Sequence, residues 1–232
     1  MCIRDRDARA AAGGLGGGRA MLLDAQALAN LEVLRNSADG GRRGTLLDAL
    51  DRTCTLWGAR ALRGWLCRPL VDVAAIEARQ EAIDCLIDAE RELRPCRASL
   101  RRLPDLERLL ARIHALSIAR ADDGATFYAN VAAARVRELV ATLRGLRDLD
   151  AAVREHLAPL LDAGELRGPL LAHCCSPDVG YPAGVADALR ELAAEFDWER
   201  AASSGRVVPA PGVCARYDGA VAAQADAERV AE

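Results

Sequence analysis

The stretch GTLLDALDRTCTLWGARALRGWLCRPL, residues 44–70, decides the fold of this chain. Thr45 and Asp48 have the spacing of a capping box, and Thr55 precedes a second segment with an apolar face, so each threonine is predicted to begin a helix. Thr53 and Thr55 are β-branched and interrupt the helical pattern between these two segments. Two short helices joined by a break are therefore predicted here.

The other distinctive side chains of this stretch also have structural roles. Gly58 allows a close approach of the backbone, and Trp65 is predicted to make the largest apolar contact. Asp51 and Arg60 carry opposite charges on the two sides of the break and are predicted to pair. Pro69 lacks a backbone N–H and ends the second helix.

Helical periodicity continues on both sides of this stretch. Asp105 and Glu107 follow Pro104 in the first turn of one helix, where negative charge favours the helix dipole. A brief extended or buried piece is expected at LEVL, 31–34, and a loop-rich region at 163–182. Further helices are expected at about 24–28, 72–93, the residues before 103, 104–116, 126–149, up to 161, 185–196, and from 217 to the last residue. The predicted fold is all-α.

The composition excludes several classes of site. All 31 basic residues are arginine, which removes Schiff-base chemistry and the lysine of a phosphate loop. A net charge of −3 gives no overall attraction for nucleic acid. Eight cysteines include no C-x-x-C pair, so reduced structural thiols are favoured over zinc ligands. No apolar run is long enough for a membrane helix, and a soluble intracellular protein is expected.

Two glycine-rich stretches and one basic run receive structural interpretations. GGLGGG at 13–18 has no preceding strand, and GGRRGT at 40–45 has no lysine, so neither predicts a nucleotide site. Arg97, Arg101, Arg102, Arg108 and Arg112 could contact phosphate. Because Asp105 and Glu107 lie among them, a solvated face or intramolecular ion pairs is the favoured interpretation.

A series of motifs carries a family resemblance. Leu50, Asp51, Thr53, Thr55, Gly58, Arg60, Leu62, Trp65, Leu66, Pro69 and Leu70 match a pattern of the MutS family of DNA mismatch repair proteins. LDAQALANLEVL at 23–34, IEARQEAIDCL at 76–86 and LPDLERLLARIHAL at 103–116 resemble neighbouring segments in the same order. The stretch 195–221 resembles the segment that returns to the lever and begins the ascent to the clamp. Trp65-Leu66-Cys67, with the Phe-Asp, Pro and Tyr-Asp pattern near the end, is most similar to the mismatch-recognising subunit of the eukaryotic MutSα heterodimer.

The resemblance implies a division of the chain and a role for it. Residues 1–20 are expected to be a disordered Gly/Arg-rich tail, 21–116 the core helices, and 117–232 the lever helices with the first part of the ascent to the DNA clamp. The last helix is expected to continue beyond Glu232. In complete family members the lever links an ATPase to the clamp, so the chain itself is expected to be non-catalytic.

The resemblance also implies cofactors, partners and location. ATP and Mg are expected only in the complete protein, and no cofactor or metal in this chain. The expected partners are the other domains of a MutS homologue, a second MutS-homologue subunit, and DNA through the clamp and mismatch-reading domains, with no membrane; the expected location is the nucleus. The alternative is a free-standing helical adapter for protein interactions, which coding sequence beyond Glu232 would exclude.

Overall fold

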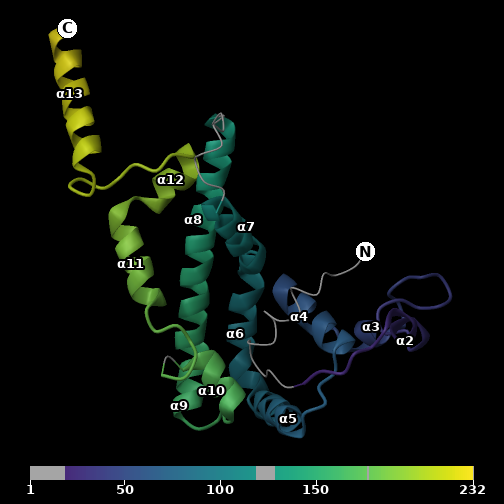
Figure 1. Ribbon diagram of the computed structural model, residues 1–232. Helices are drawn as coiled ribbons and strands as arrows, with labels where there is room; N and C mark the ends of the chain where they lie inside the picture. Colours follow the sequence, from purple (N-terminus) through teal and green to yellow (C-terminus); the bar gives the residue numbers. More distant parts are fainter. Residues whose placement is uncertain (1–18, 119–128, 177, 232) are drawn as a thin grey trace. The chain divides into compact units, whose positions relative to one another are not determined.

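The computed structural model describes residues 19–118, 129–176 and 178–231. Over these ranges the chain forms helices and no strand, with two isolated bridges, Ala20 with Leu70 and Phe196 with Pro209, as the only strand-like pairings (Figure 1). The all-α prediction is confirmed. Most of the predicted tail at 1–20 lies outside the described residues.

The helices group into two compact units that alternate along the chain. The first unit contains Met1–Asp105 and Asp148–Ala183, and the second contains Leu106–Arg147 and Gly184–Glu232. The family resemblance predicts a boundary between core and lever helices at residue 116. This boundary separates family segments and not compact units, and it stays a prediction.

The first unit is built from short and medium helices. They are α2 (Ala25–Asn30), α3 (Leu46–Leu50), α4 (Leu56–Cys67), α5 (Val73–Asp88), α6 (Glu90–Arg102), the π-helical turn η3 (Val153–Leu157), α9 (Ala158–Asp162) and α10 (Pro169–Cys175). Asp24, Thr45, Thr55 and Asp72 accept hydrogen bonds at the beginnings of α2 to α5, as N-cap residues do. The core of this unit consists of Ala82, Cys85, Ala89, Leu93, Leu166 and Leu171.

The second unit contains the longest helix of the described residues and four shorter helices. They are α7 (Leu106–Ile118), α8 (Ala129–Ala152), α11 (Val185–Glu195), α12 (Trp198–Ser204) and α13 (Ala215–Ala231), and the end of α8 belongs to the first unit. Its core consists of Val140, Leu143, Leu189, Phe196, Trp198 and Ala201. The Trp198 ring N–H donates to the Leu192 carbonyl oxygen over 3.2 Å, which satisfies its polar atom.

Three predicted segments differ from the structure. The helix predicted over 72–93 is broken at Ala89, whose side chain is only 4% exposed, and α6 begins immediately after it. The predicted loop at 163–182 contains α10, which buries Leu171 and Cys175. LEVL at 31–34 forms turns and not an extended piece, whereas the burial expected as the alternative is found at Val33. In each case the burial of small or apolar side chains outweighs the secondary structure that the local sequence favours.

Candidate functional site

The break between α3 and α4 is held by hydrogen bonds among the predicted motif residues. Asp51 accepts from both the backbone N–H of Thr53, over 3.1 Å, and its hydroxyl, over 2.6 Å. Arg42 pairs with the other carboxylate oxygen of Asp51 over 2.6 Å. The Thr53 hydroxyl contributes most, and Arg42 next, to lowering the pKa of Asp51 to about 2. Asp51 is therefore ionised throughout the physiological pH range.

Thr55 and Gly58 form the beginning of α4. The Thr55 hydroxyl accepts from the Gly58 N–H over 3.0 Å. A Cβ at position 58 would lie 2.8 Å from this hydroxyl oxygen, so a side chain there would displace the cap. The close neighbour of Gly58 is thus the capping side chain and not a second backbone segment.

Replacing Thr55 by valine is expected to lower the free energy of unfolding by about 1 kcal/mol, because valine keeps the shape of threonine but cannot accept the Gly58 hydrogen bond. Thr55→Ser keeps the hydroxyl and serves as the matched control. Urea unfolding followed by circular dichroism measures both variants. Equal stability of the valine and serine variants would contradict the capping role.

Arg60 and Asp105 join two motifs that lie far apart in the sequence. The two terminal nitrogens of Arg60 donate to the two carboxylate oxygens of Asp105 over 2.9 and 2.6 Å. The Asp105 side chain is 15% exposed, so this two-point ion pair is largely shielded from water. The predicted pairing of Arg60 with Asp51 is wrong, since Asp51 pairs with Arg42 across the preceding loop. Pairing across the break fails because both terminal nitrogens of Arg60 donate to Asp105 instead.

Trp65 lies on the surface, where its ring stacks with the guanidinium of Arg79. Its side chain is 43% exposed, and the Arg79 guanidinium stacks on its ring at 3.9 Å from the centroid. Burial lowers the pKa of Arg79, whose Nε is buried without an acceptor among the described residues. The prediction that Trp65 makes the largest apolar contact is wrong, and Trp198 is the buried tryptophan. Pro69 follows the end of α4, and its carbonyl oxygen accepts from the Met21 N–H over 2.7 Å.

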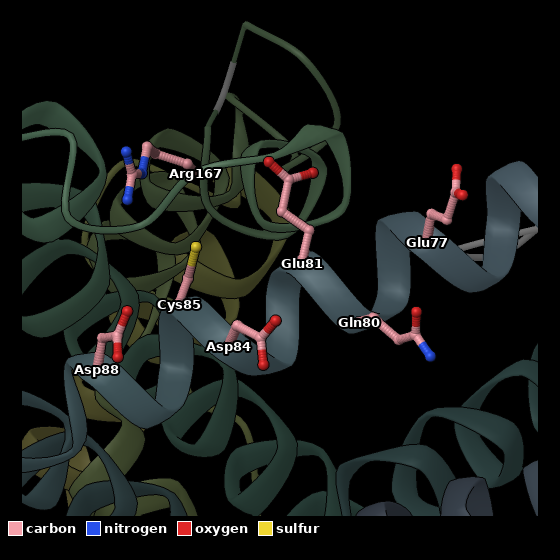
Figure 2. A pocket seen from close by; sticks show the side chains of 7 residues that line it. All are labelled: Glu77, Gln80, Glu81, Asp84, Cys85, Asp88 and Arg167. Atoms are coloured by element: carbon pink, nitrogen blue, oxygen red, sulfur yellow. The ribbon is translucent and has the colours of Figure 1, made fainter.

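Acidic side chains gather along one face of α5. They line a cavity of about 430 Å³. Figure 2 shows these side chains on α5, with Arg167 contributed by the loop before α10. The lining residues are Glu77, Gln80, Glu81, Asp84, Cys85, Asp88 and Arg167. Across the described residues, no group of three or more histidine, cysteine or acidic side chains is placed to hold a metal ion. The cavity is lined mainly by acidic side chains.

A buried carboxylate lies where α8 passes into η3. Asp150 is 7% exposed and accepts from the Tyr181 hydroxyl over 3.0 Å and from Arg154 Nε over 2.8 Å. Desolvation, and then the hydrogen bond to Asp150, raise the pKa of Tyr181 to about 12. This network links the end of α8 to the segment that follows α10, and sequence analysis did not identify it.

The raised pKa of Tyr181 predicts a dependence of stability on alkaline pH. The folded protein favours the neutral phenol, so this contribution is complete below pH 10 and is lost as the pH rises through about 12. Titration of tyrosinate absorbance should show a late step that Tyr181→Phe removes. Asp150→Asn should move that step to lower pH. A late step that persists in Tyr181→Phe would contradict the assignment.

The buried thiols have the character of structural cysteines. Burial raises the pKa of Cys96 and Cys174 and raises that of Cys175 to about 11, so these thiols stay protonated. The seven cysteines within the described part of the chain are all unpaired, as the sequence predicts. No described helix is long and apolar enough to cross a membrane.

Comparison with known proteins places these motifs in a family. Residues 26–204 match the model of MutS domain III. The chain is 37% identical to the DNA mismatch repair protein MSH6 of Arabidopsis thaliana over 201 residues, which are 85% of this chain and 15% of that protein. It is 32% identical to Msh6 of Gallus gallus over 212 residues, 88% of this chain and 16% of that protein.

A bacterial relative shows the same correspondence. The chain is 40% identical to the DNA mismatch repair protein MutS of Symbiobacterium thermophilum over 146 residues, 63% of this chain and 16% of that protein. The chain thus spans about a sixth of the length of these relatives. This chain belongs to the MutS family of DNA mismatch repair proteins, in which it corresponds to domain III and is similar to Msh6.

Proposed function

We propose that this chain is the non-catalytic core and lever segment of a mismatch repair protein, and that it links an ATPase to a DNA clamp in the complete protein. The observation that carries the proposal is the match to MutS domain III over residues 26–204. The chain itself would use no cofactor, and ATP and Mg would bind elsewhere in the complete protein. A second MutS-homologue subunit and a nuclear location are part of the same proposal.

The packing of α8 supports a mechanical role. This 24-residue helix contributes residues to both compact units. In the second unit, Arg137 Nε donates to the Ala202 carbonyl oxygen over 3.2 Å, and Arg144 pairs with Glu199 over 2.8 Å. These contacts fasten α12 to α8. A helix held in this way can transmit a displacement along its length, as a lever requires.

The exposed apolar side chains support attachment to further domains. In the first unit many of them lie between residues 21 and 73, at Met21, Leu22, Leu31, Leu46, Leu50, Leu56, Trp65, Val71 and Val73. Apolar surface of this kind usually marks an interface. An adapter would also use it, so exposure alone does not separate the two functions.

Sequencing of the reading frame beyond both ends separates the lever from the adapter. The proposal expects a DNA clamp, a mismatch-reading domain and an ATPase with a lysine-bearing phosphate loop in the same frame. A frame that encodes none of these would contradict the proposal and favour a free-standing adapter.

A second experiment tests the lever itself in the complete protein. Arg137→Ala together with Arg144→Ala removes the polar contacts between α8 and α12. We expect this variant to bind mismatched DNA but not to release the DNA when ATP is added. In the proposal, the clamp and the mismatch-reading domain bind the DNA, whereas the lever links them to the ATPase. Arg190→Ala with Arg229→Ala, which removes only exposed ion pairs within single helices, is the matched control. Normal release by the α8 variant would overturn the coupling role.

A further inference from the structure

The solvent-facing side of α6 is strongly basic. This helix of 13 residues contains five arginines and two glutamates, a net charge of +3, whereas the whole chain carries −3. Leu93 and Cys96 face the core. At 100° per residue, Arg91, Arg94, Arg101 and Arg102 lie on the side away from the core, and Arg97 lies at the edge of this basic face, nearer to Leu93. The helix therefore separates apolar and cationic faces.

Few of these charges are neutralised within the described residues. Arg91, Arg101 and Arg102 are exposed and have no carboxylate within ion-pair distance over the described ranges. Arg94 pairs with Glu90 over 3.5 Å, in an exposed pair that water screens. The sequence predicts that Asp105 neutralises this run of arginines. Both of its carboxylate oxygens instead accept hydrogen bonds from Arg60. The basic face thus remains available to an external anion.

One arginine of the face is held in position by the protein. Arg97 Nη2 donates to the Arg52 carbonyl oxygen over 2.9 Å, which fixes the guanidinium against the backbone that precedes α4. Arg94, Arg97 and Arg101 follow one another at helical spacings of three and four residues, so they form a row along the helix. Such a row suits an extended anion better than a single small one.

The residues of the basic face favour one class of polyanionic ligand over the others. A protein partner needs an apolar centre in its interface, yet none of the exposed large apolar side chains lies on α6. Single-stranded nucleic acid needs aromatic side chains for base stacking, and residues 66–126 include no Phe, Trp or Tyr. The guanidinium group matches phosphate through two parallel hydrogen bonds. A helix about 20 Å long spans roughly ten phosphates of a duplex.

We infer that the arginine face of α6 binds the phosphate backbone of duplex DNA without reading its sequence. The arginines act by replacing counterions, so binding is strongest at low ionic strength and weakens with added salt. The negative charge of the rest of the chain makes this contact a weak one, suited to assist a main DNA site located elsewhere. The inference does not depend on the lever role of α8.

The test measures binding of this chain to a fully paired, fluorescently labelled duplex by anisotropy over a range of NaCl concentrations. Arg91→Gln, Arg101→Gln and Arg102→Gln are combined, because none of these side chains forms an ion pair or hydrogen bond within the described residues. We expect the affinity at low salt to fall by about tenfold or more, and the slope of log K against log salt to decrease by roughly two to three. The corresponding three lysine substitutions should retain most of the binding.

A matched variant controls for the change in net charge. Arg200→Gln, Arg206→Gln and Arg216→Gln remove three exposed arginines of the second unit and should change the affinity by less than about twofold. Absence of duplex binding by the unchanged chain at low salt, or equal losses in the two glutamine variants, would overturn the inference. Equally tight binding of polyglutamate would overturn the assignment to DNA and indicate an acidic protein partner.

Discussion

Replacing Trp198 by alanine is expected to lower the free energy of unfolding of the second unit by about 3–5 kcal/mol, the range for large aromatic side chains removed from a core. Trp198 is 8% exposed and contacts the buried cluster of Val140, Leu143 and Leu189. The Leu192 carbonyl oxygen also loses its hydrogen-bond donor, the Trp198 ring N–H. A loss of this size is comparable with the whole stability of a small domain.

Trp65→Ala is the matched control for this prediction. It removes the same number of atoms, but Trp65 is 43% exposed and lies under Arg79 at the surface. Its loss should cost roughly 1–2 kcal/mol, mainly from the contact with Arg79 and from partial burial. Urea unfolding followed by circular dichroism measures both variants without relying on tryptophan fluorescence. A larger loss for Trp65→Ala would contradict the assignment of the buried tryptophan.

Replacing Gly205 by alanine should destabilise the second unit by about 2–4 kcal/mol, through backbone strain and a steric clash. Gly205 ends α12 with φ of +69°, in the left-handed region. A Cβ there would lie 2.5 Å from Ala133 Cβ and 3.0 Å from its Cα on α8. Because backbone cannot move aside easily, α12 would have to shift away from α8.

Gly212→Ala separates the two contributions. Gly212 has φ of +86°, but a Cβ there would meet nothing within 4 Å. This variant should show the conformational cost alone, about 1–2 kcal/mol. The difference between the two variants, obtained from the same unfolding measurement, reports the close packing of α12 on α8. Equal losses would contradict that packing.

Local signals in the sequence predicted the helix beginnings well. Asp24, Thr45 and Thr55 cap their helices as expected, because a cap depends on residues within three positions of one another. The same kind of signal was present for α12, where Asp197 accepts from the Glu199 and Arg200 N–H groups and Gly205 ends the helix. This short helix was missed because its seven residues are too few to show a periodic pattern.

The sequence by itself determined the all-α class, the capped helices around the 44–70 stretch and the family, because these depend on local chemistry and on the order of motifs. Only the tertiary structure decided that Arg60 pairs with Asp105 and that Trp198, not Trp65, is buried. It also decided that the helix predicted over 72–93 is interrupted at Ala89. A charge or an aromatic ring is compatible with several partners. Its actual partner depends on which distant helix the packing of the core brings beside it.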